Sequence, residues 1–113
     1  MRKQMIEDAA HQVATQVRAV EDCIESALTE LAELQSRMVR ARSVTRAGFV
    51  DSHAAFEQLG AATGGLITAR GGIAYCHAAL ADTKRSIPGL RTTAIGDEEC
   101  PPKTGFADLR VVA

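Results

Sequence analysis

Two ladders of apolar residues run through this sequence, one on either side of a short break near Gly48. Both ladders step strictly by four and three residues, the spacing that keeps one seam of a helix facing a partner helix. The first ladder is Ile6, Ala10, Val13, Val17, Val20, Ile24, Ala27, Leu31, Leu34 and Met38. The second ladder is Ala55, Leu59, Ala62, Leu66, Ala69, Ile73, Cys76, Leu80, Thr83 and Ile87.

The ladders predict an all-α protein, a long antiparallel two-helix hairpin that is coiled-coil-like and carries an extended C-terminal arm. We expect helices over 4–46 and 52–87, joined by a turn at 47–51, with the loop and arm over 88–113. The first helix contains neither Pro nor Gly, is acidic over most of its length and ends in a cluster of arginines. This polarity complements the helix dipole. Gly48 is the expected C′ residue, and Asp51 or Ser52 the expected cap of the second helix.

Five glycines lie inside the second helix, whereas the first helix has none. Each interior glycine costs up to about 1 kcal/mol relative to alanine. Two interpretations therefore remain open: one continuous helix, or a break at the glycine doublets that leaves 66–70 as a short strand. The ladder keeps its register across both doublets, which favours the continuous helix.

Composition indicates a thin core. Aromatic residues make up only 4% of the chain, and alanine supplies much of the apolar content. Small helical chains of this kind often need a partner to be stable, so we expect oligomerisation to complete a bundle. The net charge of −1 argues against a dedicated nucleic-acid binder, and no uncharged run could span a membrane. No secretory signal is apparent, so we expect a cytoplasmic protein, or one within an intracellularly assembled particle, with reduced cysteines.

Small residues recur at heptad spacing beside the second ladder and form what we call the glycine strip. A surface almost without side chains lets another helix approach closely, which predicts that the hairpin associates with itself there. Its alternative is a solvent-exposed face or local unwinding. The strip consists of Gly64, Gly65, Gly71, Gly72, Ala78 and Ala79.

The C-terminal arm ends in an apolar stretch that suits strand addition or docking in a groove of a neighbouring protein. Its expected contact residues are Phe106, Leu109, Val111 and Val112.

Charged and reactive residues give weaker signals. Arg37, Arg40, Arg42 and Arg46 could bind an acidic partner or simply favour the helix end. Cys23, Cys76 and His77 fall at one level of the predicted hairpin and are weak metal candidates, while the alternatives are a redox pair or a buried Cys76.

No nucleophile, base and orienting group fall together, and no cofactor motif is present, so an enzyme is not expected. The sequence therefore predicts a non-enzymatic assembly protein that binds itself and another protein, for instance in a virion, a secretion machine or a similar scaffold. The alternatives are a small protein-binding regulator, such as an antitoxin-like or chaperone-like adaptor, and a thiol or zinc sensor.

Overall fold

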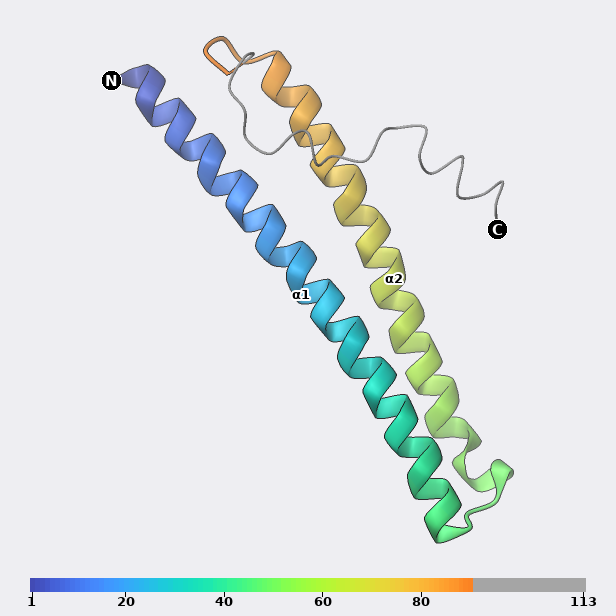
Figure 1. Ribbon diagram of the computed structural model, residues 1–113. Helices are drawn as coiled ribbons and strands as arrows, with labels where there is room; N and C mark the ends of the chain where they lie inside the picture. Colours follow the sequence, from blue (N-terminus) through green and yellow to red (C-terminus); the bar gives the residue numbers. More distant parts are fainter. Residues whose placement is uncertain (91–113) are drawn as a thin grey trace, which may run out of the picture. The chain divides into compact units, whose positions relative to one another are not determined.

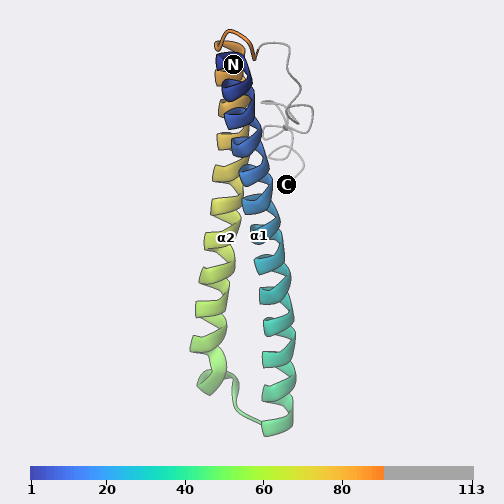
Figure 2. The ribbon, with the colours of Figure 1, turned by 90° about the vertical axis from the view of Figure 1, so that its left-hand side faces the viewer.

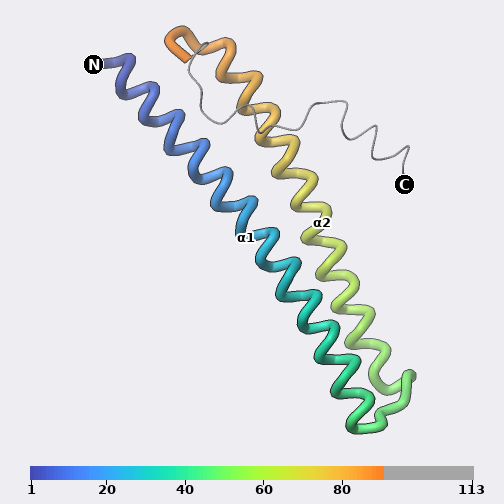
Figure 3. Tube along the Cα trace, viewed as in Figure 1, coloured from blue at the N-terminus to red at the C-terminus, as the bar shows by residue number. Residues whose placement is uncertain are grey.

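A computed structural model of the chain describes residues 1–90 and contains two long helices (Figure 1). Helix α1 spans Arg2–Thr45 and helix α2 spans Phe49–Arg85. The described part of the chain is therefore all-helical, and it reverses direction once, as a helical hairpin does (Figure 3).

The chain divides into two compact units, which we describe separately. Unit 1 combines residues 1–20 with the chain from residue 71 onward, and unit 2 is residues 21–70. In each unit a segment of α1 lies beside an antiparallel segment of α2, as Figures 1 and 2 show from two directions. The predicted arm falls at 91–113, apart from its first three residues, and lies outside the described residues.

The turn in unit 2 is tighter than expected. Arg46 takes the left-handed conformation, with φ of 57°, at the position directly after α1. Our expectation that Gly48 would be this C′ residue is wrong. Gly48 instead precedes α2, and its carbonyl oxygen accepts bonds from both the backbone N–H and the Oγ of Ser52. The second helix thus begins at Phe49, three residues earlier than predicted, and Asp51 lies in its first turn.

Helix α2 runs without a break through both glycine doublets, so the alternative of a strand at 66–70 is wrong. A Cβ built at Gly60, Gly64, Gly65, Gly71 or Gly72 would meet no atom of another element within 4 Å. Because no described residue crowds these positions, the glycines lower helix propensity without serving packing within residues 1–90.

The first ladder forms the inner face of α1. Most of its members are half-buried, from Ile6 through Val17 and Ile24 to Met38. Val13 and Leu34 are exceptions, because each leaves 47% of its surface exposed. Both belong to the same heptad position, which therefore lies at the edge of the contact in each unit.

The second ladder is only half correct. Its Leu59, Leu66, Ile73 and Ile87 positions are buried or half-buried, but the alternate positions are exposed. Those exposed positions are Ala55, Ala62, Ala69, Cys76 and Thr83. The inner face is completed instead by the heptad position on the other side of the leucines, where Phe56, Thr63, His77 and Lys84 are half-buried. Larger side chains and aliphatic stems cover more apolar surface than alanine does, so α2 turns this side inward.

After α2 the chain closes a short turn. The N–H of Ile87 bonds the carbonyl of Lys84, and the N–H of Leu90 bonds the carbonyl of Ile87. Gly89 has φ of 94°, and the side chain of Leu90, only 3% exposed, packs back into unit 1.

Candidate functional site

An apolar groove lies between the two helix segments of unit 1. It encloses about 170 Å³. Helix α1 lines it with Ala10, Val13, Ala14 and Val17. Helix α2 and the turn after it supply His77, Leu80, Ala81, Thr83, Lys84, Ile87 and Leu90.

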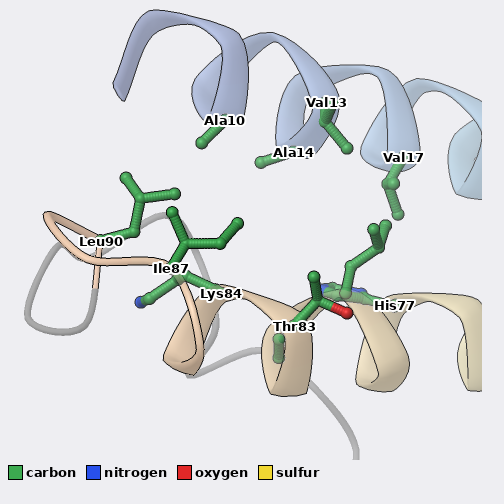
Figure 4. A pocket seen from close by; sticks show the side chains of 11 residues that line it. Ala10, Val13, Ala14, Val17, His77, Thr83, Lys84, Ile87 and Leu90 are labelled. Carbon is green, nitrogen blue, oxygen red and sulfur yellow. The ribbon is translucent and has the colours of Figure 1, made fainter. Parts of the chain in front are cut away.

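Side chains point into this groove from both helices (Figure 4). Val13 and Val17 project from α1 toward α2, and Ile87 and Leu90 project back. Most of these residues belong to the two ladders, so the groove is the open part of the predicted seam. Small ligands usually occupy pockets of about 300–1,000 Å³. A space of this size instead suits one apolar side chain of an incoming protein, because a cavity of about 150 Å³ accepts a single benzene ring.

An ion pair links the two helix segments of unit 2. The Nε of Arg70 donates to Oε1 of Glu25, and this hydrogen bond, together with the carboxylate charge, raises the pKa of Arg70 above its ordinary value. Both side chains are exposed, so the pair contributes little to stability. The pair identifies the edge of the two helix segments on which Glu25 and Arg70 lie.

The other edges of the two helix segments in unit 2 carry three apolar residues. Heptad spacing places Leu34 on the edge of α1 away from the Glu25–Arg70 pair, and Ala62 and Ala69 on the matching edge of α2. All three residues are exposed. In unit 1, Val13 shares the heptad position of Leu34 and is 47% exposed, and Leu80, at the heptad position of Leu66 and Ile73, is 37% exposed. Both residues line the groove. We call these exposed ladder residues the apolar edge of each unit.

The glycine strip adjoins the apolar edge. Gly65 in unit 2, and Gly72 and Ala79 in unit 1, are exposed and follow the exposed alanines around α2 by heptad spacing. Gly71 and Ala78 are half-buried, and Gly64 is exposed. Four of the six strip residues are thus exposed, and self-association through them stays a prediction.

The predicted arginine group lies at the end of α1 in unit 2, but its members differ in their contacts. Arg37 forms an ion pair with Glu33, with 3.0 Å between Nε and Oε1. Arg40 donates to Oγ of Ser36, and the guanidinium of Arg42 lies 4.0 Å from the ring centroid of Phe49. The contact with Phe49 was missed in the sequence, since it depends on the start of α2 rather than on any spacing.

Of the predicted reactive residues, Cys23 belongs to unit 2, and Cys76 and His77 belong to unit 1. Cys23 and Cys76 are both exposed and carry free thiols, so the expectation of a buried Cys76 is wrong. His77 is half-buried and lines the groove. Within residues 1–90, no three His, Cys, Asp or Glu side chains gather so that they could hold a metal ion.

The remaining predicted contacts, Phe106, Leu109, Val111 and Val112, lie outside the described residues. In the same described part, neither helix contains a segment long and apolar enough to cross a membrane.

The fold thus defines a helical hairpin with an apolar groove in one unit and apolar edges in both. No protein-family model matches the chain, and neither does any curated protein or solved structure.

Proposed function

We propose that this chain is a non-enzymatic assembly protein, a helical hairpin that associates with copies of itself and docks its C-terminal arm on a neighbour within a multi-subunit particle. One observation carries the proposal. Among residues 1–90 the buried hydrophobic side chains are only Leu59, Ala81 and Leu90, and none of the described side chains is fully buried.

Such a core is too small for the length of helix it has to support. Helices in proteins are stabilised mainly by packing of their apolar faces, and each interior glycine of α2 works against the helix. Two paired helices bury one stripe each and leave the rest of both surfaces in water. A second hairpin would cover more of these surfaces and give the wider apolar contact of a four-helix bundle.

The apolar edges are the surfaces that we assign to self-association. On α1 they carry the larger residues Val13 and Leu34, and on α2 they carry Ala62 and Ala69 beside the glycine strip. Large residues of one hairpin can enter the small-residue surface of another, which is the complementarity that close helix packing needs. The surface is therefore suited to a second copy of itself.

The arm is assigned to the groove of unit 1 in a neighbouring copy. The groove holds space for one apolar side chain, and the arm offers Phe106, Leu109, Val111 and Val112 in a short stretch. Substituting Leu80, in the groove wall, by Asp should then weaken assembly, whereas Ile67→Asp, an exposed position of unit 2, should not.

The experiment that tests the proposal is thermal unfolding, followed by circular dichroism, over a hundredfold range of protein concentration. If folding is coupled to association, Tm rises with concentration because the folded state is favoured by mass action. A Tm that stays constant over this range would mean that the hairpin folds alone, and the proposal would fail.

A small protein-binding regulator is the second candidate, favoured by the exposed Arg37, Arg40 and Arg46 at the end of α1. It differs in stoichiometry, because a regulator should be a small oligomer that changes state when its partner is added. A thiol or zinc sensor has no comparable support among the described residues.

A further inference from the structure

The segments on either side of the turn between the helices carry exposed apolar side chains and more arginines than carboxylates. The nearest carboxylate is that of Asp51, in the first turn of α2, which lies beside Gly48 and offsets part of the positive charge. We define the hairpin tip as residues 40–50, all within unit 2. Its apolar side chains are Val44, Phe49 and Val50, which are 81%, 76% and 90% exposed. From Leu34 to Val50 the sequence contains four arginines and no Asp or Glu.

Three of these arginines lie within the tip, and none of them forms an ion pair with a carboxylate of residues 1–90. Arg40 donates only to the Ser36 hydroxyl. Arg42 is stacked on Phe49, and Arg46 occupies the left-handed position of the turn. The tip therefore has an excess of positive charge that a negatively charged partner would neutralise.

The stacking of Arg42 on Phe49 joins the two properties. It keeps a guanidinium directly over an exposed ring, so a partner that contacts Phe49 also meets the charge. Val50 follows at once in the first turn of α2 and is the most exposed of the three apolar residues.

A partner that binds this tip must provide negatively charged groups for the arginines and, next to them, an apolar region that can take up Phe49 and Val50. Val44 lies in the last turn of α1, and Phe49 and Val50 lie in the first turn of α2, so all three adjoin the turn between the helices and none of them lines the groove. Exposed side chains in this position suit a surface that deforms around them. An anionic bilayer has phosphates at its surface and acyl chains directly beneath them, which is the order of charge and apolar groups that the tip presents.

We propose that the hairpin tip docks on an anionic phospholipid surface, with Phe49 and Val50 entering the interface and Arg40, Arg42 and Arg46 against the lipid phosphates. This is surface attachment, without a spanning segment, and it does not depend on self-association. A single short apolar segment binds weakly, so the arginines are needed for affinity, and attachment should require anionic lipid.

The first test is sedimentation of the full chain with vesicles. Vesicles of phosphatidylcholine containing about one quarter phosphatidylserine should bind the protein, whereas pure phosphatidylcholine should not, and added salt should release it. Val50→Ser should weaken binding about tenfold and Arg46→Gln about fivefold. Ile67→Ser removes an aliphatic side chain that is 57% exposed and lies outside the tip, and Arg2→Gln removes an equal charge, so both should bind like the parent.

The second test uses the absence of tryptophan in the chain. Phe49→Trp creates a single reporter at the tip, and its emission should shift to the blue with anionic vesicles, while Ile67→Trp should not shift. Circular dichroism confirms that each variant is helical. If the protein does not bind anionic vesicles, the proposal is overturned. That result is expected if the natural partner of the tip is an acidic protein. The proposal is also overturned if Val50→Ser binds as well as the parent and the emission of the Phe49→Trp variant does not shift. In that case the arginines alone would hold the protein on the lipid, and no apolar side chain would enter it.

Discussion

The guanidinium of Arg42 stacks on the ring of Phe49, with 4.0 Å between its central carbon and the ring centroid. This contact joins the last turn of α1 to the first residue of α2 across a turn of only three residues. The cation–π pair therefore ties the two helices together at the point where the hairpin closes.

The first prediction concerns this pair. Replacing Arg42 by Gln and Phe49 by Leu, singly and together, should give a coupling energy of about 0.5–1 kcal/mol in the free energy of unfolding, as expected for an exposed cation–π contact. Urea unfolding at one fixed protein concentration measures it. A coupling energy near zero would mean that the two side chains stabilise the turn independently.

The second prediction concerns Arg46. Its positive φ is unfavourable for a residue with a Cβ, so Arg46→Gly should raise the free energy of unfolding by about 1 kcal/mol. Arg40→Gly is the matched control, since it removes the same charge from the interior of α1. That variant should lose about 1 kcal/mol, because glycine is a poor helix former. Equal effects of the two variants would contradict a left-handed Arg46.

The third prediction concerns the open glycines. Gly60→Ala lies outside the strip and should stabilise α2 by up to about 1 kcal/mol, since a Cβ there meets no neighbouring atom. Gly65→Ala and Gly72→Ala should give a similar gain in helicity, but a smaller gain in Tm if the strip packs against a second hairpin. Gly89→Ala, at φ of 94°, should be destabilising. Circular dichroism during thermal unfolding reports all four variants.

The fourth prediction concerns the small core of unit 2. Leu59→Ala should lower the free energy of unfolding by about 2–3 kcal/mol, because Leu59 is buried and its loss leaves a cavity. Ile67→Ala, in the same helix but exposed, should cost less than about 0.5 kcal/mol. If Ile67→Ala proves as costly as Leu59→Ala, the inner face of α2 has been assigned to the wrong side.

The sequence predicted the two helices and the inner face of α1 because these depend on strict periodicity and on the absence of Pro and Gly. It did not predict the orientation of α2. Two possible seams share Leu59, Leu66 and Ile73 and differ only in the neighbouring position. One seam adds alanines and Cys76, and the other adds Phe56 and longer polar residues. Heptad spacing fits both seams equally well, so the choice depends on how much apolar surface each one buries against α1.

The candidate site was predictable only in part. The sequence assigned Ala62 and Ala69 to the contact between the two helices of one hairpin. The structure leaves both residues exposed, and we propose that they contact a second hairpin instead. The tip was less accessible to sequence reasoning. Arg42 and Phe49 are seven residues apart and meet only because the turn closes tightly after Arg46, and no periodic pattern reports the length of a turn.

The central claim, that the hairpin is completed by copies of itself, is tested most directly by the absolute mass of the purified chain. Light scattering on a sizing column, at low and high salt, should give a defined multiple of 12.0 kDa that persists at high salt, since the assigned surfaces are apolar. A folded, fully helical species with the mass of one chain at both salt concentrations would contradict the account. It would leave the apolar edges and the glycine strip without a partner of their own kind.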